Sequence, residues 1–140
     1  FSNNIRNNFG FLNRCEDSDP KARDKTFRQE GRKVFKEVVP IAAAHIEGHL
    51  ASLGLQPAGV RRFWLHQANE GMNQLVIKRL LGEAGADRAP LILDEFANTA
   101  SAGSIIAFHQ HRADLAAGDV GVVCSFGAGY SVGSVVVKKR

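Results

Sequence analysis

Apolar residues recur along most of the chain at spacings that predict alternating helices and strands. Over residues 29–53 they lie three and four positions apart, which predicts a helix that Pro40 should kink or interrupt. The same spacing predicts helices over 68–81 and 101–115. The apolar stripe of the helix over 68–81 comprises Met72, Leu75, Val76, the stem of Arg79 and Leu80. Short apolar runs predict strands at RRFWL (61–65), PLILDEF (90–96), GVVCSF (121–126) and SVGSVVVKK (131–139).

This order of elements predicts a layered α/β fold with a mixed sheet. The glycine-rich GAGY (127–130) separates the last two strands by a short turn, which predicts an antiparallel hairpin. Residues 1–26 are polar, rich in asparagine and charged, and we interpret them as an N-terminal arm or a loop leading into the fold. Residues 27–140 would then form a single folded unit, as suits a chain of 140 residues.

Composition excludes several classes of function. Hydrophobic residues make up 44% and charged residues 23%, which is typical of ordinary globular proteins. The net charge of +4 comes from scattered lysines and arginines, so we expect no nucleic-acid partner. No apolar run reaches membrane length, so we expect no membrane partner. Cys15 and Cys124 match neither disulfide nor metal spacing, which predicts a cytoplasmic setting. Because Phe1 is not a start residue, we expect a piece of a longer protein.

Two polar residues lie where predicted strands give way to helices. His66 follows RRFWL, at a position where ligand sites gather in α/β folds, although a structural histidine fits that position equally well. Asn98 follows PLILDEF and precedes a helix that opens with small residues, which lets a ligand approach the backbone. A capping or turn role is the commoner one for such an asparagine.

Other candidate sites in the sequence are weaker. His45 and His49 lie one helical turn apart, but no third metal ligand is evident, so we interpret them as a solvated face. Cys124 lies in an apolar strand, where a thiol is usually inert, and Cys15 lies among acidic residues, which discourage a nucleophile. FGAGYSVG (126–133) lacks both the glycine spacing and the following helix of a dinucleotide site. We therefore expect no metal, no cofactor and no nucleophile in this chain.

Three motifs occur together and in order: HQAN (66–69), NTASAGS (98–104) and FGAGYSVGSVVV (126–137). With GRKVFKEVVP (31–40) upstream, the combination closely resembles the C-terminal half of β-ketoacyl-acyl-carrier-protein synthase III, a member of the thiolase superfamily. The resemblance covers roughly residues 27–140. It implies one βαβαβαββ half of a five-layered αβαβα fold.

The resemblance implies an acyltransferase of fatty-acid biosynthesis, which joins an acyl group to malonyl-acyl-carrier protein with loss of carbon dioxide. Acyl-coenzyme A and malonyl-acyl-carrier protein would be the substrates. His66 and Asn98 match the catalytic histidine and asparagine of the family. The turn matches the segment that lends a backbone N–H to an oxyanion hole, and the substrate-binding residues would be Gln67, Asn69, Phe126, Gly127 and Ala128. The nucleophilic cysteine belongs to the N-terminal half, so we expect this piece alone to be inactive.

The chemistry agrees with these roles. Decarboxylation of a malonyl thioester leaves negative charge on the thioester oxygen, which two N–H donors can stabilise. One nitrogen of His66 must then face the substrate, so the other needs an orienting partner, which we predict to be a backbone N–H of the final hairpin. The alternatives are a polyketide-type or other acyl-transferring enzyme of the superfamily, or a non-catalytic half that binds the carrier protein. Expected partners are acyl-carrier protein, the chain's own N-terminal half and a second copy in a homodimer.

The sequence departs from the family pattern at two further places. Many members carry an arginine that helps to dock the carrier protein, and Gly71 stands at that position here. Carrier docking would then use other cations, for which we expect Lys78, Arg79, Arg61 or Arg62. Ala100 is an additional residue ahead of Ser101, which should adjust the start of the third helix.

Overall fold

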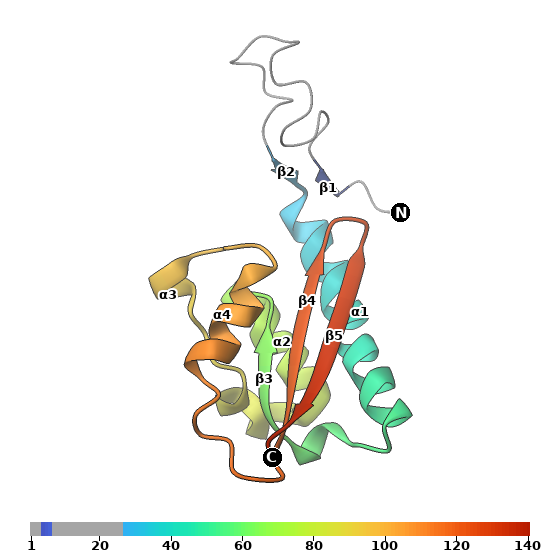
Figure 1. Ribbon diagram of the computed structural model, residues 1–140. Coiled ribbons are helices and arrows are strands. Elements are labelled where there is room, and N and C mark those ends of the chain that lie inside the picture. Colours follow the sequence, from blue (N-terminus) through green and yellow to red (C-terminus); the bar gives the residue numbers. More distant parts are fainter. Residues whose placement is uncertain (1–3, 7–26) are drawn as a thin grey trace.

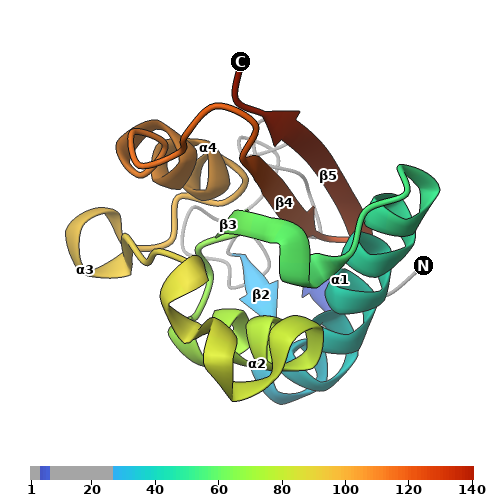
Figure 2. The ribbon, with the colours of Figure 1, turned by 90° about the horizontal axis from the view of Figure 1, so that it is seen from below.

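The computed structural model describes residues 4–6 and 27–140. A three-stranded sheet has two helices on one face and a third, shorter helix on the other (Figures 1 and 2). The sheet has the order β3-β4-β5, formed by β3 (Val60–Leu65), β4 (Val120–Gly127) and β5 (Ser131–Lys138). β3 and β4 run parallel, whereas β4 and β5 form the antiparallel hairpin expected from the sequence. The sheet is therefore mixed, as predicted.

The layer on one face consists of α1 (Gly31–Ser52) and α2 (Glu70–Leu81). The other face carries α4 (Ala102–Gln110), and a short α3 (Leu93–Phe96) lies ahead of it (Figure 2). Two stretches of 3-10 helix are η2 (Pro57–Gly59) and the longer η3 (Gly82–Arg88). Outside the main sheet, β1 (Ile5–Arg6) pairs antiparallel with β2 (Arg28–Gln29). Most of the N-terminal arm that the sequence predicts over 1–26 lies outside the described residues.

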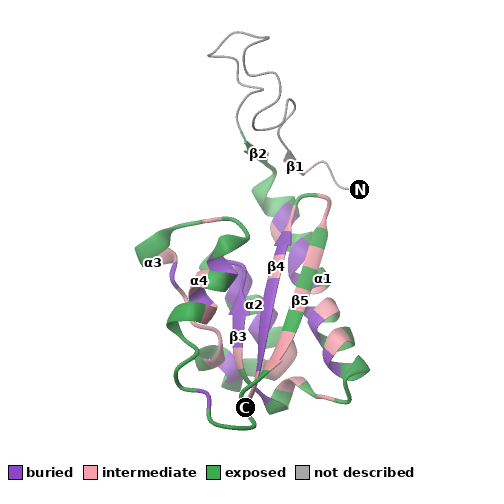
Figure 3. Cartoon of the chain, in the orientation of Figure 1, coloured by how far each residue is buried: buried purple, intermediate pink, exposed green. Residues whose placement is uncertain are grey.

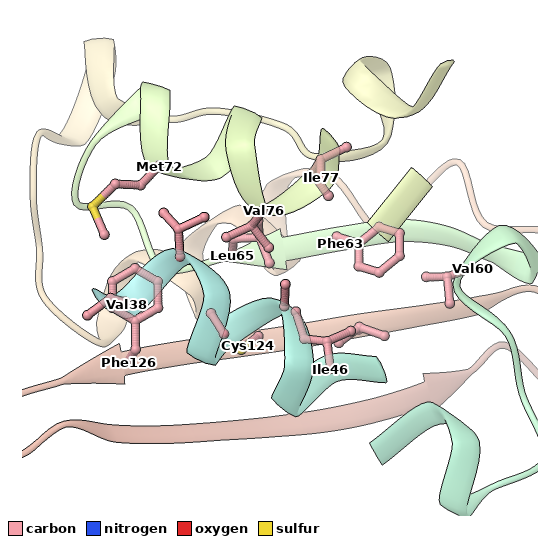
Figure 4. Close-up of a cluster of buried hydrophobic side chains, with 14 of the residues drawn as sticks. Val38, Ile46, Val60, Phe63, Leu65, Met72, Val76, Ile77, Cys124 and Phe126 are labelled. Carbon is pink, nitrogen blue, oxygen red and sulfur yellow. The ribbon is translucent and has the colours of Figure 1, made fainter. Parts of the chain in front are cut away.

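Two hydrophobic clusters hold these layers together. The larger one lies between the sheet and the α1–α2 layer and includes Phe63, Leu65 and Phe126 from the strands (Figure 4). The smaller one lies under α4 and includes Trp64 and Val123, the strand residues that alternate to the opposite face. β4 is buried along most of its length, while β5 alternates between exposed and half-buried residues (Figure 3).

Pro40 does not interrupt α1, so an interruption at this proline is excluded, whereas a kink there stays a prediction. The helix continues from Gly31 to Ser52 with the proline inside it. Apolar side chains on both sides of Pro40, including Val38 and Ala42, are buried in the same cluster. Their burial offsets the hydrogen bond that the proline removes, a loss of about 3 kcal/mol in a helix interior.

The strand predicted at PLILDEF is also wrong. Leu91 and Ile92 are irregular, and Leu93–Phe96 forms the short helix α3. Ile92 is buried, but its backbone N–H donates to the side-chain oxygen of Gln67 at 3.1 Å instead of joining a strand. The side chain of Gln67, two residues after β3, therefore satisfies a backbone group that a neighbouring strand would otherwise pair with.

Smaller corrections concern helix bounds and faces. α4 ends at Gln110, five residues before the predicted end, and Leu115 packs under it from the following loop. On α2, Leu75 is 39% exposed, because Met72, Asn73, Val76 and Ile77 form the buried face.

No helix in the described part of the chain is long and apolar enough to cross a bilayer.

The pair His45 and His49 is not a solvated face. Both residues are half-buried against β5, and both rings contact the hydroxyl of Ser134. Nδ1 of His49 lies 2.7 Å and Nε2 of His45 lies 3.0 Å from that oxygen. The two histidines therefore connect α1 to the edge strand.

Candidate functional site

The carboxyl ends of β3 and β4 meet at one end of the sheet (Figure 1), and His66 directly follows β3. The parallel register pairs Leu65 with Cys124, which brings the residue after Leu65 beside Ser125 and Phe126. The ring of His66 lies 4.5 Å from that of Phe126 between centroids, tilted by 45°. The Phe126 ring and the strand ends fix the position of the imidazole.

His66 is only 7% exposed, and this burial lowers the pKa of its imidazole. The ring is therefore neutral near pH 7 and carries one N–H. Its Nδ1 lies 3.0 Å from the Ser125 hydroxyl oxygen, and among the described residues its Nε2 has no hydrogen-bond partner. The prediction that a backbone N–H of the hairpin orients His66 is wrong, because a side-chain hydroxyl on β4 occupies that position.

Gln67 is fully buried and braces the segment that leads to α4. Its amide nitrogen donates to the Leu65 carbonyl at 2.9 Å, and its amide oxygen accepts the Ile92 N–H at 3.1 Å. Gly103 lies directly against it, since a Cβ atom there would be 2.8 Å from the Gln67 Cβ. These contacts engage both ends of the Gln67 amide, so this arrangement does not favour a contact between Gln67 and the substrate. That expected contact stays a prediction.

Asn69 begins α2 as its N-cap. Its side-chain oxygen accepts the Met72 N–H at 3.2 Å, and the residue is exposed to solvent. Capping of this kind satisfies one of the free N–H groups at a helix start. The amide nitrogen of Asn69 remains available, so a substrate contact there stays a prediction.

Asn98 lies in an exposed loop with unusual backbone angles on both sides. Ala97 and Ala100 have φ angles of 55° and 54°, in the left-handed region that non-glycine residues rarely adopt. The Ala100 N–H donates to the Asn98 side-chain oxygen at 2.9 Å. Ala100 thus closes a turn on Asn98, and α4 begins only at Ala102. The additional residue forms this turn without lengthening the helix.

The contacts of the described residues bring His66 together with Ser125 and Phe126, and Gln67 together with Ile92 and Gly103. They do not include a contact between His66 and Asn98. The convergence of those two side chains on one substrate atom therefore stays a prediction.

The turn between β4 and β5 comes shortly after Ser125, the partner of His66. Phe126 is 6% exposed, Gly127 ends β4, and Ala128 is exposed at the tip. Cys124, two residues earlier, is buried, and burial raises the pKa of its thiol to about 12. The expectation that Cys124 is inert packing is confirmed, because such a thiol stays protonated and un-nucleophilic.

A cavity of about 540 Å³ opens beside the start of α2, next to the residues that follow His66. Phe35 and Met72 contribute apolar walls, and Arg32 and Lys36 contribute positive charge. Gly71 lies close by, since a Cβ atom there would be 3.7 Å from the Phe35 ring. The sequence contained a signal for these cations, a basic pair four residues apart in GRKVFK, but such a pair is usually only a solvated helix face.

None of the cations that the sequence suggested for carrier docking lines this cavity. Arg61 and Arg62 lie at the start of β3, the opposite end of the strand from His66, and Arg62 is ion-paired with Asp114. Lys78, near the end of α2, is ion-paired with Glu83. Within residues 4–6 and 27–140, no group of three or more histidines, cysteines and carboxylates could hold a metal ion.

The chain is similar to enzymes that build 3-oxoacyl groups on carrier proteins. Residues 50–139 match the family model described as 3-Oxoacyl-[acyl-carrier-protein (ACP)] synthase III C terminal. Beta-ketodecanoyl-[acyl-carrier-protein] synthase of Pseudomonas aeruginosa is 61% identical over 141 residues, which cover 100% of this chain and 40% of that protein. Beta-ketoacyl-[acyl-carrier-protein] synthase III of Gloeobacter violaceus is 32% identical over 120 residues, 84% of this chain and 36% of that protein.

Similarity extends to three-dimensional structure. The crystal structure of 3-oxoacyl-(acyl carrier protein) synthase III from Pseudomonas aeruginosa matches with a TM-score of 0.82 at 25% identity, over 99% of this chain and 42% of that chain. The fold expected from the sequence, one half of a thiolase-like enzyme, is thereby confirmed. The chain spans about two fifths of the length of these relatives.

Proposed function

Because the chain belongs to the 3-oxoacyl-[acyl-carrier-protein] synthase III C-terminal family, we propose that it is the half of a condensing enzyme that decarboxylates the malonyl substrate. The observation that carries this proposal is the state of His66. It is a buried, neutral imidazole at the carboxyl ends of two parallel strands, with Nδ1 occupied by Ser125. A neutral ring offers an N–H donor without needing to transfer a proton.

In the proposed reaction, a cysteine of the N-terminal half holds the acyl group as a thioester. The malonyl thioester loses carbon dioxide, and the electron pair of the broken C–C bond passes into an enolate. His66 and Asn98 donate hydrogen bonds to the enolate oxygen. The enolate carbon then attacks the acyl thioester, and the cysteine thiolate leaves and takes up a proton. The product is a 3-oxoacyl thioester on the carrier protein.

The hydrogen bonds of Asn98 support its role as a donor. A backbone N–H is always a donor, so the Asn98 atom that meets the Ala100 N–H must be the amide oxygen. The amide nitrogen has no partner among the residues that the structure describes. The two N–H donors of Asn98 are therefore not used by the described residues, and stabilisation of an oxyanion requires such donors. The turn at Phe126, Gly127 and Ala128 would supply a backbone N–H to the acyl-thioester oxygen.

We assign the substrate length from the relative that is 61% identical, whose name specifies a ketodecanoyl product. Condensation adds two carbons, so the acyl group would carry eight. The donor of that acyl group would be a thioester of coenzyme A, and the malonyl group would arrive on acyl-carrier protein. Carrier docking would use Arg32 and Lys36, which border the cavity beside Asn69, in place of the family arginine at Gly71.

The face of the sheet that carries α4 supports a second half as its partner. Ile105 on α4 is 58% exposed and Val135 on β5 is 59% exposed, although both are large apolar residues. Exposed apolar surface of this kind marks an interaction site. We propose that the N-terminal half covers it, that this chain alone is inactive, and that the complete enzyme is a homodimer.

The test separates the two half-reactions of the full-length enzyme. We expect His66→Ala and Asn98→Ala each to slow malonyl decarboxylation about a hundredfold, while acyl transfer to the cysteine changes far less. His111→Ala, an exposed histidine just beyond α4, is the matched control and should leave both rates unchanged. Equal loss in both half-reactions would reject the proposed role.

A further inference from the structure

We propose that Ser125 is a positioning residue that sets the tautomer of His66, so that the imidazole presents an N–H to the substrate. The consequence for catalysis rests on the proposed function, whereas the tautomer itself does not. The structure places the Ser125 hydroxyl oxygen 3.0 Å from Nδ1 of His66. Phe126 is buried in the larger cluster, so Ser125, its neighbour on β4, faces the side of the sheet that carries α4 and the Asn98 loop.

Counting hydrogen atoms favours one of two arrangements of this contact. A serine hydroxyl has one hydrogen to donate and two lone pairs that accept, while a neutral imidazole has one N–H and one bare nitrogen. If Nδ1 carried the hydrogen, it would donate to Ser125, and the serine hydrogen would need another acceptor. The residues of the described part offer Ser125 no hydrogen bond other than the one to His66.

The reverse arrangement satisfies both groups with one hydrogen bond. The Ser125 O–H donates to Nδ1, so Nδ1 is bare and Nε2 carries the hydrogen. Burial of His66 lowers its pKa and keeps the ring from taking a second proton near pH 7, so the tautomer is well defined. Nε2 has no partner in the described residues and remains free to donate.

The tautomer matters because an enolate oxygen is negative. An Nε2–H facing that oxygen is attractive, whereas a bare Nε2 would point a lone pair at it. Without the Ser125 hydroxyl the two tautomers of His66 would differ little in energy, and part of the enzyme would carry the unproductive one. Ser125 therefore acts through His66 and need not touch the substrate.

The tautomer can be read directly from the ¹⁵N shifts of histidine ring nitrogens. In the full-length enzyme with ¹⁵N-labelled histidine, the His66 signals are identified by their loss in His66→Gln. We expect the wild type to show a bare Nδ1 and a protonated Nε2. Ser125→Ala should shift population to the other tautomer, while Ser125→Thr, which keeps a hydroxyl, should retain the wild-type pattern. Ser134→Ala removes the serine that contacts two other histidines and should leave the His66 signals unchanged.

Kinetics complete the test. If about half of the enzyme carried the unproductive tautomer, the rate would fall about twofold, so Ser125→Ala should slow decarboxylation by at least that factor with little change in acyl loading. A protonated Nδ1 in the wild type, or an unchanged tautomer in Ser125→Ala, would overturn the positioning role. If Ser125→Ala shifts the tautomer but His66→Ala leaves decarboxylation intact, the tautomer assignment stands and the proposed function falls.

Discussion

Gln67 is the brace between the end of β3 and the segment that carries Asn98, and Gln67→Met tests that function. Methionine keeps the length and the apolar stem of the side chain but removes the amide. The buried Ile92 N–H, now 3.1 Å from the amide oxygen, would lose its acceptor. The Leu65 carbonyl, now 2.9 Å from the amide nitrogen, would lose its donor.

These losses set the size of the effect. A buried N–H left without a partner costs about 1–3 kcal/mol, and an ordinary hydrogen bond contributes about 1 kcal/mol. The contact between the Gln67 amide nitrogen and the Pro90 carbonyl is 3.4 Å long and adds little. We therefore expect Gln67→Met to destabilise the segment around Ile92 by about 2–4 kcal/mol. At 1.4 kcal/mol per factor of ten, amide exchange there should accelerate by about thirtyfold or more.

Hydrogen exchange measured by mass spectrometry in the full-length enzyme gives the readout, on peptides that cover residues 90–103. Peptides from α1 serve as the internal reference. The matched control is Gln74→Met, because the Gln74 amide lies on the exposed face of α2 and bonds only the Glu70 carboxylate, at 2.8 Å. A change in stability within about 0.5 kcal/mol is expected there. Unchanged amide exchange in Gln67→Met, or equal effects of the two variants, would refute the stabilising role of the Gln67 amide.

Three further predictions concern packing, the α1–β5 contact and pH. Gly121→Ala should destabilise the fold by more than about 3 kcal/mol in chemical denaturation, because its Cβ would lie 2.2 Å from the buried Trp64 ring. Gly48→Ala, a helix position with no atom within 4 Å of a new Cβ, should instead stabilise by about 0.5–1 kcal/mol. Ser134→Ala should cost about 1–2 kcal/mol in the same assay, because two helix histidines lose their shared hydroxyl. Since the pKa of His66 is lowered from 6.5 in the folded state, the unfolded state binds more protons between the two values, and the free energy of unfolding should fall as the pH drops below 6.5. A His66→Gln variant should show a weaker pH dependence over that range.

Periodicity predicted those elements whose apolar residues meet one continuous core. α1 and α2 bury a face at helical spacing, β3 and β4 are short apolar runs buried on both faces, and the sequence located all of them and β5. It failed at PLILDEF because Ile92 satisfies its backbone with a side chain 25 residues away. It also misjudged His45 and His49, since only the register of β5 places Ser134 between them. Contacts between residues far apart in the chain do not show in the spacing of apolar residues along the sequence.

The sequence likewise located some residues of the candidate site and missed others. The position of His66 after a buried strand was readable, because the apolar run and the following helix bracket it. Ser125 was not, since it lies inside an ordinary strand pattern and becomes a partner only through the parallel register of β3 and β4. Arg32 and Lys36 were missed because only the folded helix places them at a cavity beside Asn69.

His66 and Asn98 share a feature that neither shows alone. Each has one hydrogen-bond acceptor atom, and each uses it on a group from its own neighbourhood: Nδ1 on the Ser125 hydroxyl and the amide oxygen on the Ala100 N–H. What remains to face a substrate is therefore an N–H from both residues. Under the proposed function, N–H donors from both residues suit an oxygen that gains negative charge, whereas His66 with Nδ1 occupied offers no base for a step that removes a proton from the substrate. The left-handed backbone at Ala100, which costs about 1–2 kcal/mol in an L-residue, accompanies the hydrogen bond from the Ala100 N–H to the Asn98 oxygen.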